Sequence, residues 1–181
     1  MRRAIPFLAT LTLLGGCFSL PPGPGPDLST PYNTLRYLED SYAIQDSSFV
    51  YQVLDDDFRF AFDREDWDTQ PGDYRIPPDG IWTISSERTA TRNMFYEATG
   101  IDIYLALKDM EPLIEGASIY TSGPIYYRII YYYNEDYDSY YITGYANFDM
   151  QKQDGDWIIT RWSDQKVGEH SWGWLKALYR L

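Results

Sequence analysis

Cysteine and histidine are almost absent from the sequence, since each occurs once in 181 residues. The lone cysteine, Cys17, excludes an internal disulfide, because a disulfide joins two cysteines. The lone histidine, His170, excludes a multi-histidine metal site, and its place beside Glu169 in an expected surface loop gives little support to histidine-dependent acid–base chemistry. We therefore expect neither a metal ion nor another cofactor.

Basic residues and long hydrophobic runs are also scarce. The chain has 15 Lys and Arg against 27 Asp and Glu, a formal net charge of −12. Nucleic acid is not an expected partner, because its binding depends largely on basic side chains that displace counterions from phosphates. The same charge opposes adsorption to an anionic lipid surface, so membrane association requires an anchor. The apolar run at residues 5–14 is too short to span a bilayer as a helix.

Residues 1–16 have the features of a lipoprotein signal peptide. A short cationic start, an apolar segment and the small residues of LGGC follow one another in the order typical of a secretory signal. The motif resembles a bacterial lipobox, in which the cysteine becomes the lipidated N-terminus. We predict lipidation of Cys17 and anchoring in the cell envelope. Phe18, in place of an aspartate, favours the outer membrane with the protein facing the periplasm.

The remaining chain is long enough for one domain with a substantial core. Residues 17–28 comprise the lipidated cysteine and a tether whose PPGPGP segment favours extended conformations. We assign residues 29–181 to a single domain, with a C-terminal extension at 168–181.

Helix signals open this domain. Thr30 is a suitable N-cap and Pro31 suits the first helical position, and the apolar residues that follow recur at helical spacing. A second, shorter helix is expected from about Asp46 to a solvated turn at residues 55–57. A third is expected at residues 85–97, after a long loop at residues 64–79.

Strand signals follow. Alternating phenylalanines predict a first strand after residue 57, and alternating apolar residues predict a second at 101–107. The stretch 123–164 predicts three long strands joined by turns, GPIYYRIIYYYNED, DSYYITGYANFDMQKQDG and DWIITRWSD. Trp157 and Trp162 are five apart and are expected on opposite faces of the last strand. Gly144 is expected to bend the middle one.

The C-terminal extension contains SWGWLKALYRL. Trp172, Leu175 and Leu178 fall on one face of a short helix, with Lys176 on another. Such a helix is too short to be stable alone in water. We expect it to dock either on the sheet of its own domain or on a partner.

These segments together resemble the NTF2-like, cystatin-like and SnoaL-like superfamily. TPYNTLRYLEDSYAIQDSSFVYQVLDDDFRFAF resembles its opening helices and first strand, and DGDWIITRWSD resembles its closing strand. The resemblance implies an α+β fold, an NTF2-like cone in which a strongly bent antiparallel sheet wraps around an N-terminal helix, with a short C-terminal helix added. Within the superfamily the chain resembles uncharacterised bacterial lipoproteins, and the resemblance also implies a homodimer through the open sheet face.

A cone of this kind encloses a pocket lined by one face of each strand, which suits a small apolar ligand. The candidate pocket residues are Tyr127, Arg128, Tyr131, Tyr145 and Arg161. For Arg128 the alternative is an ordinary cross-strand ion pair with Asp149 or Glu135.

No convergent catalytic set is visible in the sequence. We therefore predict a non-catalytic envelope lipoprotein that binds a partner protein or a small apolar ligand. The alternative is a small lyase or isomerase that uses a carboxylate and a tyrosine for acid–base chemistry, as in ketosteroid isomerase of the same superfamily. A carboxylate deep in the cone beside a tyrosine would favour the enzyme, and a purely aromatic and aliphatic lining would favour binding.

Overall fold

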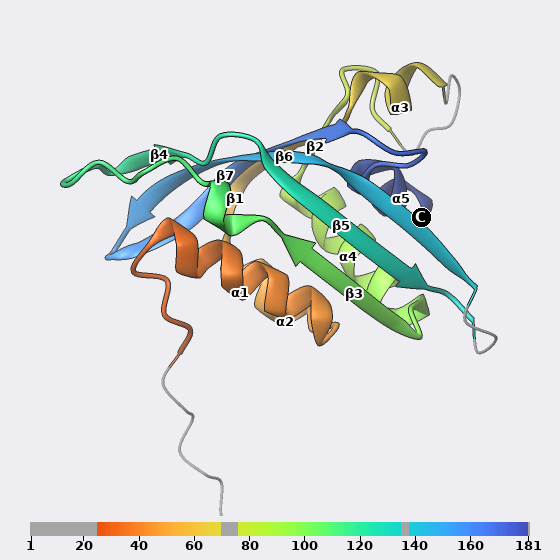
Figure 1. Ribbon diagram of the computed structural model, residues 1–181, viewed down its shortest axis with the longest axis horizontal. Helices are drawn as coiled ribbons and strands as arrows, with labels where there is room; N and C mark the ends of the chain where they lie inside the picture. The colour runs from red at the N-terminus through yellow and green to blue at the C-terminus, as the bar shows by residue number, and fades with distance from the viewer. Residues whose placement is uncertain (1–24, 70–75, 135–137, 181) are drawn as a thin grey trace, which may run out of the picture.

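The computed structural model describes residues 25–69, 76–134 and 138–180 (Figure 1). The predicted signal peptide, Cys17 and most of the tether lie outside the described residues. Within the described part of the chain, no helix is long and apolar enough to cross a membrane.

The domain begins with α1 (Pro31–Ala43), as predicted. The Thr30 hydroxyl oxygen accepts a hydrogen bond from the Asn33 amide at 3.1 Å, and Pro31 occupies the first turn. This cap satisfies one of the amides that a helix N-terminus leaves without a partner. The helix buries Leu35 and Leu38 against the sheet.

One bent sheet contains all seven strands found in the described residues. They are β1 (Leu54–Ala61), β2 (Ile81–Thr83), β3 (Gly100–Leu105), β4 (Ile119–Thr121), β5 (Ile125–Tyr132), β6 (Ser139–Gln153) and β7 (Asp156–Lys166). Their order is β2-β1-β7-β6-β5-β3, and β4 pairs with β6 beyond the end of β5. The predicted meander is confirmed as β5, β6 and β7.

The sheet is antiparallel except where β1 runs parallel to β7. The sequence predicted an antiparallel sheet throughout. Strands joined by a tight hairpin must be antiparallel, but β1 and β7 lie about a hundred residues apart, so no hairpin fixes their relative direction.

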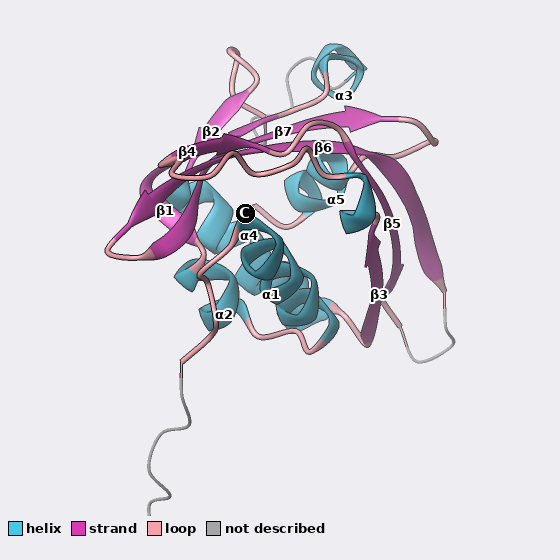
Figure 2. Cartoon of the chain, turned by 60° about the vertical axis from the view of Figure 1, so that its left-hand side comes forward, coloured by secondary structure: helices cyan, strands magenta, loops and turns pink. Residues whose placement is uncertain are grey.

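The other helices are α2 (Ser47–Gln52), α3 (Arg64–Thr69), α4 (Ile84–Glu97), the single 3₁₀ turn η1 (Leu107–Asp109) and α5 (Trp172–Leu178). Figure 2 shows that α1, α4 and α5 lie on the concave side of the sheet, whereas α3 lies beyond its upper edge. The core therefore sits between the inner face of the sheet and these three helices.

Trp157 and Trp162 lie on the same face of β7, so the prediction of opposite faces is wrong. Ile159 pairs with Met150 and Arg161 pairs with Asp149, which leaves Thr160 as an extra residue. A β-bulge of this kind reverses the alternation of side chains beyond it. Both tryptophans are consequently buried on the concave side.

The acidic residues 55–57 lie inside β1 rather than in a turn that follows α2. Leu54 pairs with Ile159 of β7 and Arg59 pairs with Arg161. Between these two pairs β1 has four residues and β7 has one, so the pairing of the strands is irregular there. The half-buried Asp55 carboxylate accepts hydrogen bonds from the Gln153 side chain and the Asp57 amide. The strand therefore starts earlier than the sequence pattern indicated, with the aspartates bulging into solvent.

Candidate functional site

The concave side of the sheet, where a cone fold would hold a ligand, is occupied by the C-terminal helix α5. Trp172 is fully buried there, and its ring centre lies 4.9 Å from that of Tyr42, 5.2 Å from that of Tyr127 and 4.2 Å from that of Trp162. All three contacts are edge-to-face, a favourable arrangement for aromatic rings. The predicted docking of this segment on its own domain is confirmed.

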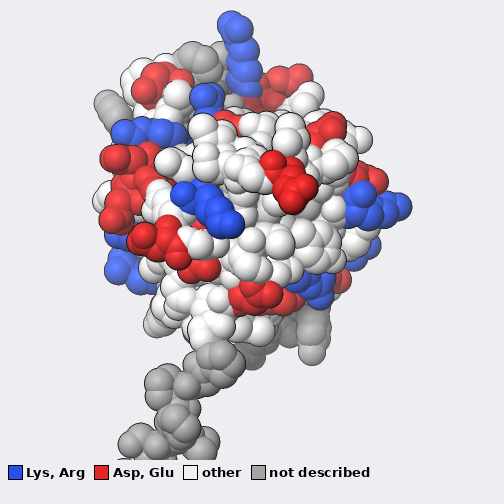
Figure 3. All heavy atoms as spheres, turned by 90° about the vertical axis from the view of Figure 1, so that its left-hand side faces the viewer, with Lys and Arg blue, Asp and Glu red and all other residues white. Residues whose placement is uncertain are grey.

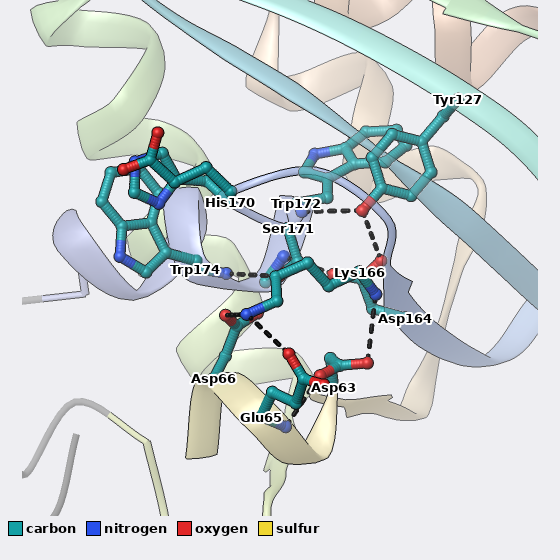
Figure 4. A network of polar contacts seen from close by, with 12 residues as sticks. Asp63, Glu65, Asp66, Tyr127, Asp164, Lys166, His170, Ser171, Trp172 and Trp174 are labelled. Atoms are coloured by element: carbon teal, nitrogen blue, oxygen red, sulfur yellow. Dashed lines mark hydrogen bonds and ion pairs between the residues drawn. The ribbon is translucent and has the colours of Figure 1, made fainter. Parts of the chain in front are cut away.

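The first turn of α5 is held by polar groups of the sheet and of its own N-cap (Figure 4). The Trp172 amide donates to the Tyr127 hydroxyl at 2.9 Å, and the Gly173 amide donates to Asp164 Oδ2 at 2.6 Å. The Trp174 amide donates to the Ser171 hydroxyl at 2.9 Å. Three amides that a helix start would otherwise leave unpaired are thereby satisfied.

Two glycines make room for this arrangement. A Cβ atom on Gly173 would stand 2.8 Å from the Phe62 ring and 3.2 Å from Asp164 Oδ2. A Cβ atom on Gly144 would collide with the Tyr127 hydroxyl and with the backbone oxygen of Gln165. Gly144, which the sequence analysis assigned to sheet curvature, is therefore also the place where the Tyr127 side chain crosses β6.

Tyr127 and Asp164 form the kind of pair that acid–base catalysis uses. The Tyr127 hydroxyl donates to Asp164 Oδ1 at 2.7 Å. Burial raises the pKa of Asp164 to about 6, although its hydrogen bonds with Gly173 and Tyr127 act in the opposite direction. Burial and the neighbouring carboxylate also raise the pKa of Tyr127.

Both groups are nevertheless fully engaged with α5. The Tyr127 hydroxyl donates to Asp164 and accepts from Trp172, and each oxygen of Asp164 accepts one hydrogen bond. In this arrangement the pair holds a helix, and it can reach a substrate only after α5 has left.

A second polar pair lies deeper under the same helix. Lys176 of α5 and Glu87 of α4 are both fully buried, and Lys176 Nζ lies 2.7 Å from Glu87 Oε1. Glu87 also accepts hydrogen bonds at 3.2 Å from the Trp82 indole and the Thr91 hydroxyl. Burial lowers the pKa of Lys176, while the Glu87 carboxylate favours the charged form.

The aromatic surroundings of Lys176 compensate part of its desolvation. Its Nζ stands 3.5 Å from the ring centre of Trp162 and 4.2 Å from that of Phe60, distances at which a cation is attracted to the ring face. Lys176 was expected on a different face of the helix from the apolar residues that dock, but it is fully buried as well. A lysine between Leu175 and Ala177 carries no sequence signal for burial.

The rim of the site is closed by α3 and by the segment before α5. Lys166 Nζ lies 3.0 Å from Glu65 Oε2, which raises the pKa of Lys166 above its usual value. The Lys166 amide donates to Asp63 at 3.0 Å. His170, expected in a surface loop, is half-buried and stacks on Trp174 with ring centres 3.6 Å apart. Figure 4 shows these contacts beside the start of α5.

The five predicted pocket residues lie on two different faces of the sheet. Tyr127 and Tyr131 point into the concave side, where the Tyr131 hydroxyl donates to the Met94 backbone oxygen at 2.9 Å. Arg128, Tyr145 and Arg161 have the opposite phase and lie on the outer face. They cannot line one pocket together with the two tyrosines.

The predicted ion-pair partners of Arg128 also differ from the observed one. Its guanidinium lies 3.9 Å from the Asp102 carboxylate of β3, because Tyr104 and Arg128 are directly opposite and Asp102 is two residues along the same face. Asp149 lies farther along β6, opposite Arg161, and Glu135 lies outside the described residues.

A metal centre finds no support among the described residues, where no group of three or more His, Cys, Asp or Glu side chains is placed to hold an ion. The functional groups that the sequence analysis missed are Asp164, Lys176 and Glu87. Their pairing depends on contacts between residues that are far apart in the chain, so local patterns do not reveal it.

Comparison with solved structures identifies the fold as an NTF2-like, cystatin-like cone. An NTF2-like superfamily protein from Salmonella enterica aligns with a TM-score of 0.54 and 11% identity, covering 78% of this chain and 92% of that chain. A cystatin-like protein from Caulobacter vibrioides aligns with a TM-score of 0.52 and 8% identity, covering 75% and 86%.

The similar structures also include an enzyme. A hexachlorocyclohexane dehydrochlorinase, LinA type 2, aligns with a TM-score of 0.51 and 10% identity, covering 77% of this chain and 87% of that chain. Identities this low concern the fold alone, because one fold hosts many unrelated functions. No protein-family model and no curated protein matches the chain.

The buried pair of Lys176 and Glu87 predicts strong energetic coupling. Lys176→Met leaves the Glu87 carboxylate buried without its cation, and we expect a loss of about 3–5 kcal/mol in the free energy of unfolding. Glu87→Gln is expected to be destabilising as well. The double variant should lose about 1–3 kcal/mol less than the sum of the single variants. Urea denaturation of the four proteins measures this coupling.

The exposed pair of Arg88 and Asp56, 3.4 Å apart, is the matched control. Its coupling, measured with Arg88→Met and Asp56→Asn, should stay below about 1 kcal/mol. Simple additivity at Lys176 and Glu87 would contradict the buried pairing.

Proposed function

We propose that this protein is a non-catalytic lipoprotein of the cell envelope whose NTF2-like domain binds another protein chain through the outer face of its sheet. The observation that carries the proposal is the position of α5. Trp172, Leu175 and Lys176 are buried on the concave side, in the space where a small ligand would otherwise bind. A small apolar ligand in the cone is for that reason the weaker of the two binding hypotheses.

The outer face of β3, β5 and β6 has the composition of a protein-binding surface. Tyr104, Tyr141 and Tyr145 expose 42%, 59% and 37% of their surface there. Tyrosine and arginine are enriched at protein interfaces, where they combine large contact area with hydrogen bonding. Arg128 is the arginine of this surface, and the Asp102 carboxylate balances its charge.

A second copy of this chain is the partner that best fits such a surface. The protein as a whole carries a formal charge of −12, so two copies repel each other over most of their surfaces. A nearly neutral patch lets them meet while their acidic regions stay apart. A two-fold symmetric contact uses the same patch on both copies.

Anchoring is supported by the N-terminal sequence. The cationic start, apolar segment and LGGC motif end at Cys17, and a tether rich in proline and glycine separates this residue from α1. Because the acidic domain is repelled by anionic lipid, a covalent lipid is the means of attachment that the sequence favours.

The second candidate function, a lyase or isomerase, is favoured by the pair of Tyr127 and Asp164. A carboxyl group with a pKa of about 6 beside a tyrosine is suited to proton transfer near neutral pH. This function requires α5 to leave the concave side, since the helix uses both groups.

If Cys17 carries the lipid anchor, Cys17→Ser should change how the protein partitions between membrane and water. The wild-type protein should partition into the membrane fraction and into the detergent phase, because acyl chains favour an apolar environment. Cys17→Ser has no thiol to acylate and should remain uncleaved or appear in the aqueous phase. Phe18→Ser serves as the control and should still partition with the detergent. A Cys17→Ser protein that is cleaved like the wild type and partitions equally into the detergent phase would contradict the anchor.

If the outer face of the sheet binds another protein chain, photocrosslinking from this face in intact cells should capture that chain. A photoreactive phenylalanine analogue in place of Tyr141 should yield an adduct of one discrete mass. The same analogue in place of Tyr96, which is 86% exposed on α4, should not. An adduct of twice the mass of the protein identifies a second copy, and another mass identifies a different envelope protein. Position 141 without an adduct would contradict the proposed interface.

A further inference from the structure

Four large apolar side chains are exposed together at one end of the domain. Tyr32, Leu113, Ile114 and Ile119 expose 51%, 43%, 77% and 72% of their surface. We call these four residues the apolar end. Single exposed apolar residues are ordinary, but a contiguous group marks a surface that contacts something other than water.

Two of the four residues, Tyr32 and Leu113, meet at one hollow although they are far apart in the chain. This hollow has a volume of about 350 Å³, and its lining includes Tyr32 from the start of α1 and Leu113 from the segment before β4. Pro31, Met110 and Tyr120 complete most of its apolar wall. Ile119 precedes Tyr120 on β4, so its side chain lies on the face of the strand opposite to the hollow.

The tether enters the domain at this same end. Leu28 is buried, and its backbone oxygen accepts a hydrogen bond from the Trp157 amide at 2.8 Å. The Asp27 carboxylate accepts a hydrogen bond from the Asn33 side chain at 2.8 Å. The chain therefore emerges at a fixed place, two residues before Thr30, which itself lines the hollow.

The length of the tether limits how far the domain can lie from its anchor. Ten peptide units join Cys17 to Asp27, and a fully extended chain of this length spans at most about 35 Å. A lipid on Cys17 would therefore hold Asp27 within about 35 Å of the bilayer. The other end of α1, near Ile44, lies about 20 Å from the start of this helix along its axis.

Both signs of charge occur near the apolar end. Lys108 and Lys152 lie there with Asp27, Asp109, Glu111, Glu115 and Asp156, a sum of −3 where the chain carries −12. Figure 3 shows the side on which β4 and the start of α1 lie, with a broad area of uncharged side chains between scattered charges. This uncharged area can approach a lipid surface without charge repulsion.

We propose that the apolar end inserts into the headgroup region of the membrane that carries the anchor, so that the lipoprotein stands on the bilayer in one fixed orientation. Branched aliphatic side chains gain free energy on leaving water, and a tyrosine ring is suited to the boundary between water and hydrocarbon. The inference rests on the proposed lipidation of Cys17. Its occupant is lipid rather than protein because the tether delivers this end to the lipid.

The test uses the full lipidated chain in vesicles of phosphatidylcholine and phosphatidylethanolamine that contain nitroxide-labelled acyl chains. Because lipidation blocks the thiol of Cys17, Ile114→Cys introduces the single site for an environment-sensitive fluorophore. Ile44→Cys is the matched control, since Ile44 is 60% exposed at the end of α1. The label at 114 should lose roughly half or more of its emission, and the label at 44 little.

Ile119→Cys provides a second position should Ile114→Cys fold poorly, and it should be quenched as well. Equal quenching at 44 and at both positions of the apolar end, or quenching at none of them, would overturn the inference while leaving the anchor intact. Mass spectrometry of the same samples reports the acyl chains on Cys17. Their absence would overturn the proposed anchor and this inference together.

Discussion

The structure depends on filling the concave side of a sheet that bends around three helices. A sheet this curved cannot bury its inner face against one helix alone, and a large apolar surface left open to water would cost about 25 cal/mol for each Å². The chain supplies its own C-terminal helix for this place, with Trp172, Leu175 and Ala177 fully or almost fully buried. A seven-residue helix has no stability of its own in water. Its order therefore comes from these contacts and from the hydrogen bonds that the Trp172 and Gly173 amides donate to Tyr127 and Asp164.

The same helix divides the molecule into two faces with different roles. The polar groups of the concave side serve the fold, since Tyr127 and Asp164 bind the start of α5 and Glu87 pairs with Lys176. The outer face carries tyrosines that remain partly exposed to water. This arrangement supports the proposed binding of another protein chain by the outer face. Its similarity to solved structures that include an enzyme concerns the shared cone and not the contents of the cone.

Much of the fold could be predicted from local patterns, whereas most of the site could not. Thr30 and Pro31 predict the start of α1 because capping is a local interaction, and the alternation of β5 predicts its two faces. The alternation in β7 is interrupted by the bulge at Thr160, which depends on pairing with β6. The pairing of Tyr127 with Asp164 and the burial of Lys176 depend on where α5 docks. Gly144 and Gly173 each stand where a Cβ atom would collide with a neighbouring group, but the local pattern predicted only a bend at Gly144 and nothing at Gly173.

We expect α5 to stay on the concave side for as long as the domain is folded. Hydrogen exchange of the amides of Trp172 and Gly173 tests it most directly, with the buried amide of Phe148 in β6 as the reference. The account predicts that all three amides exchange through the same global unfolding, with the same free energy of opening. Exchange at Trp172 and Gly173 that is on the order of 100-fold faster than at Phe148 would mean that α5 opens by itself. That result would contradict the account and make the cone available to a ligand or a substrate.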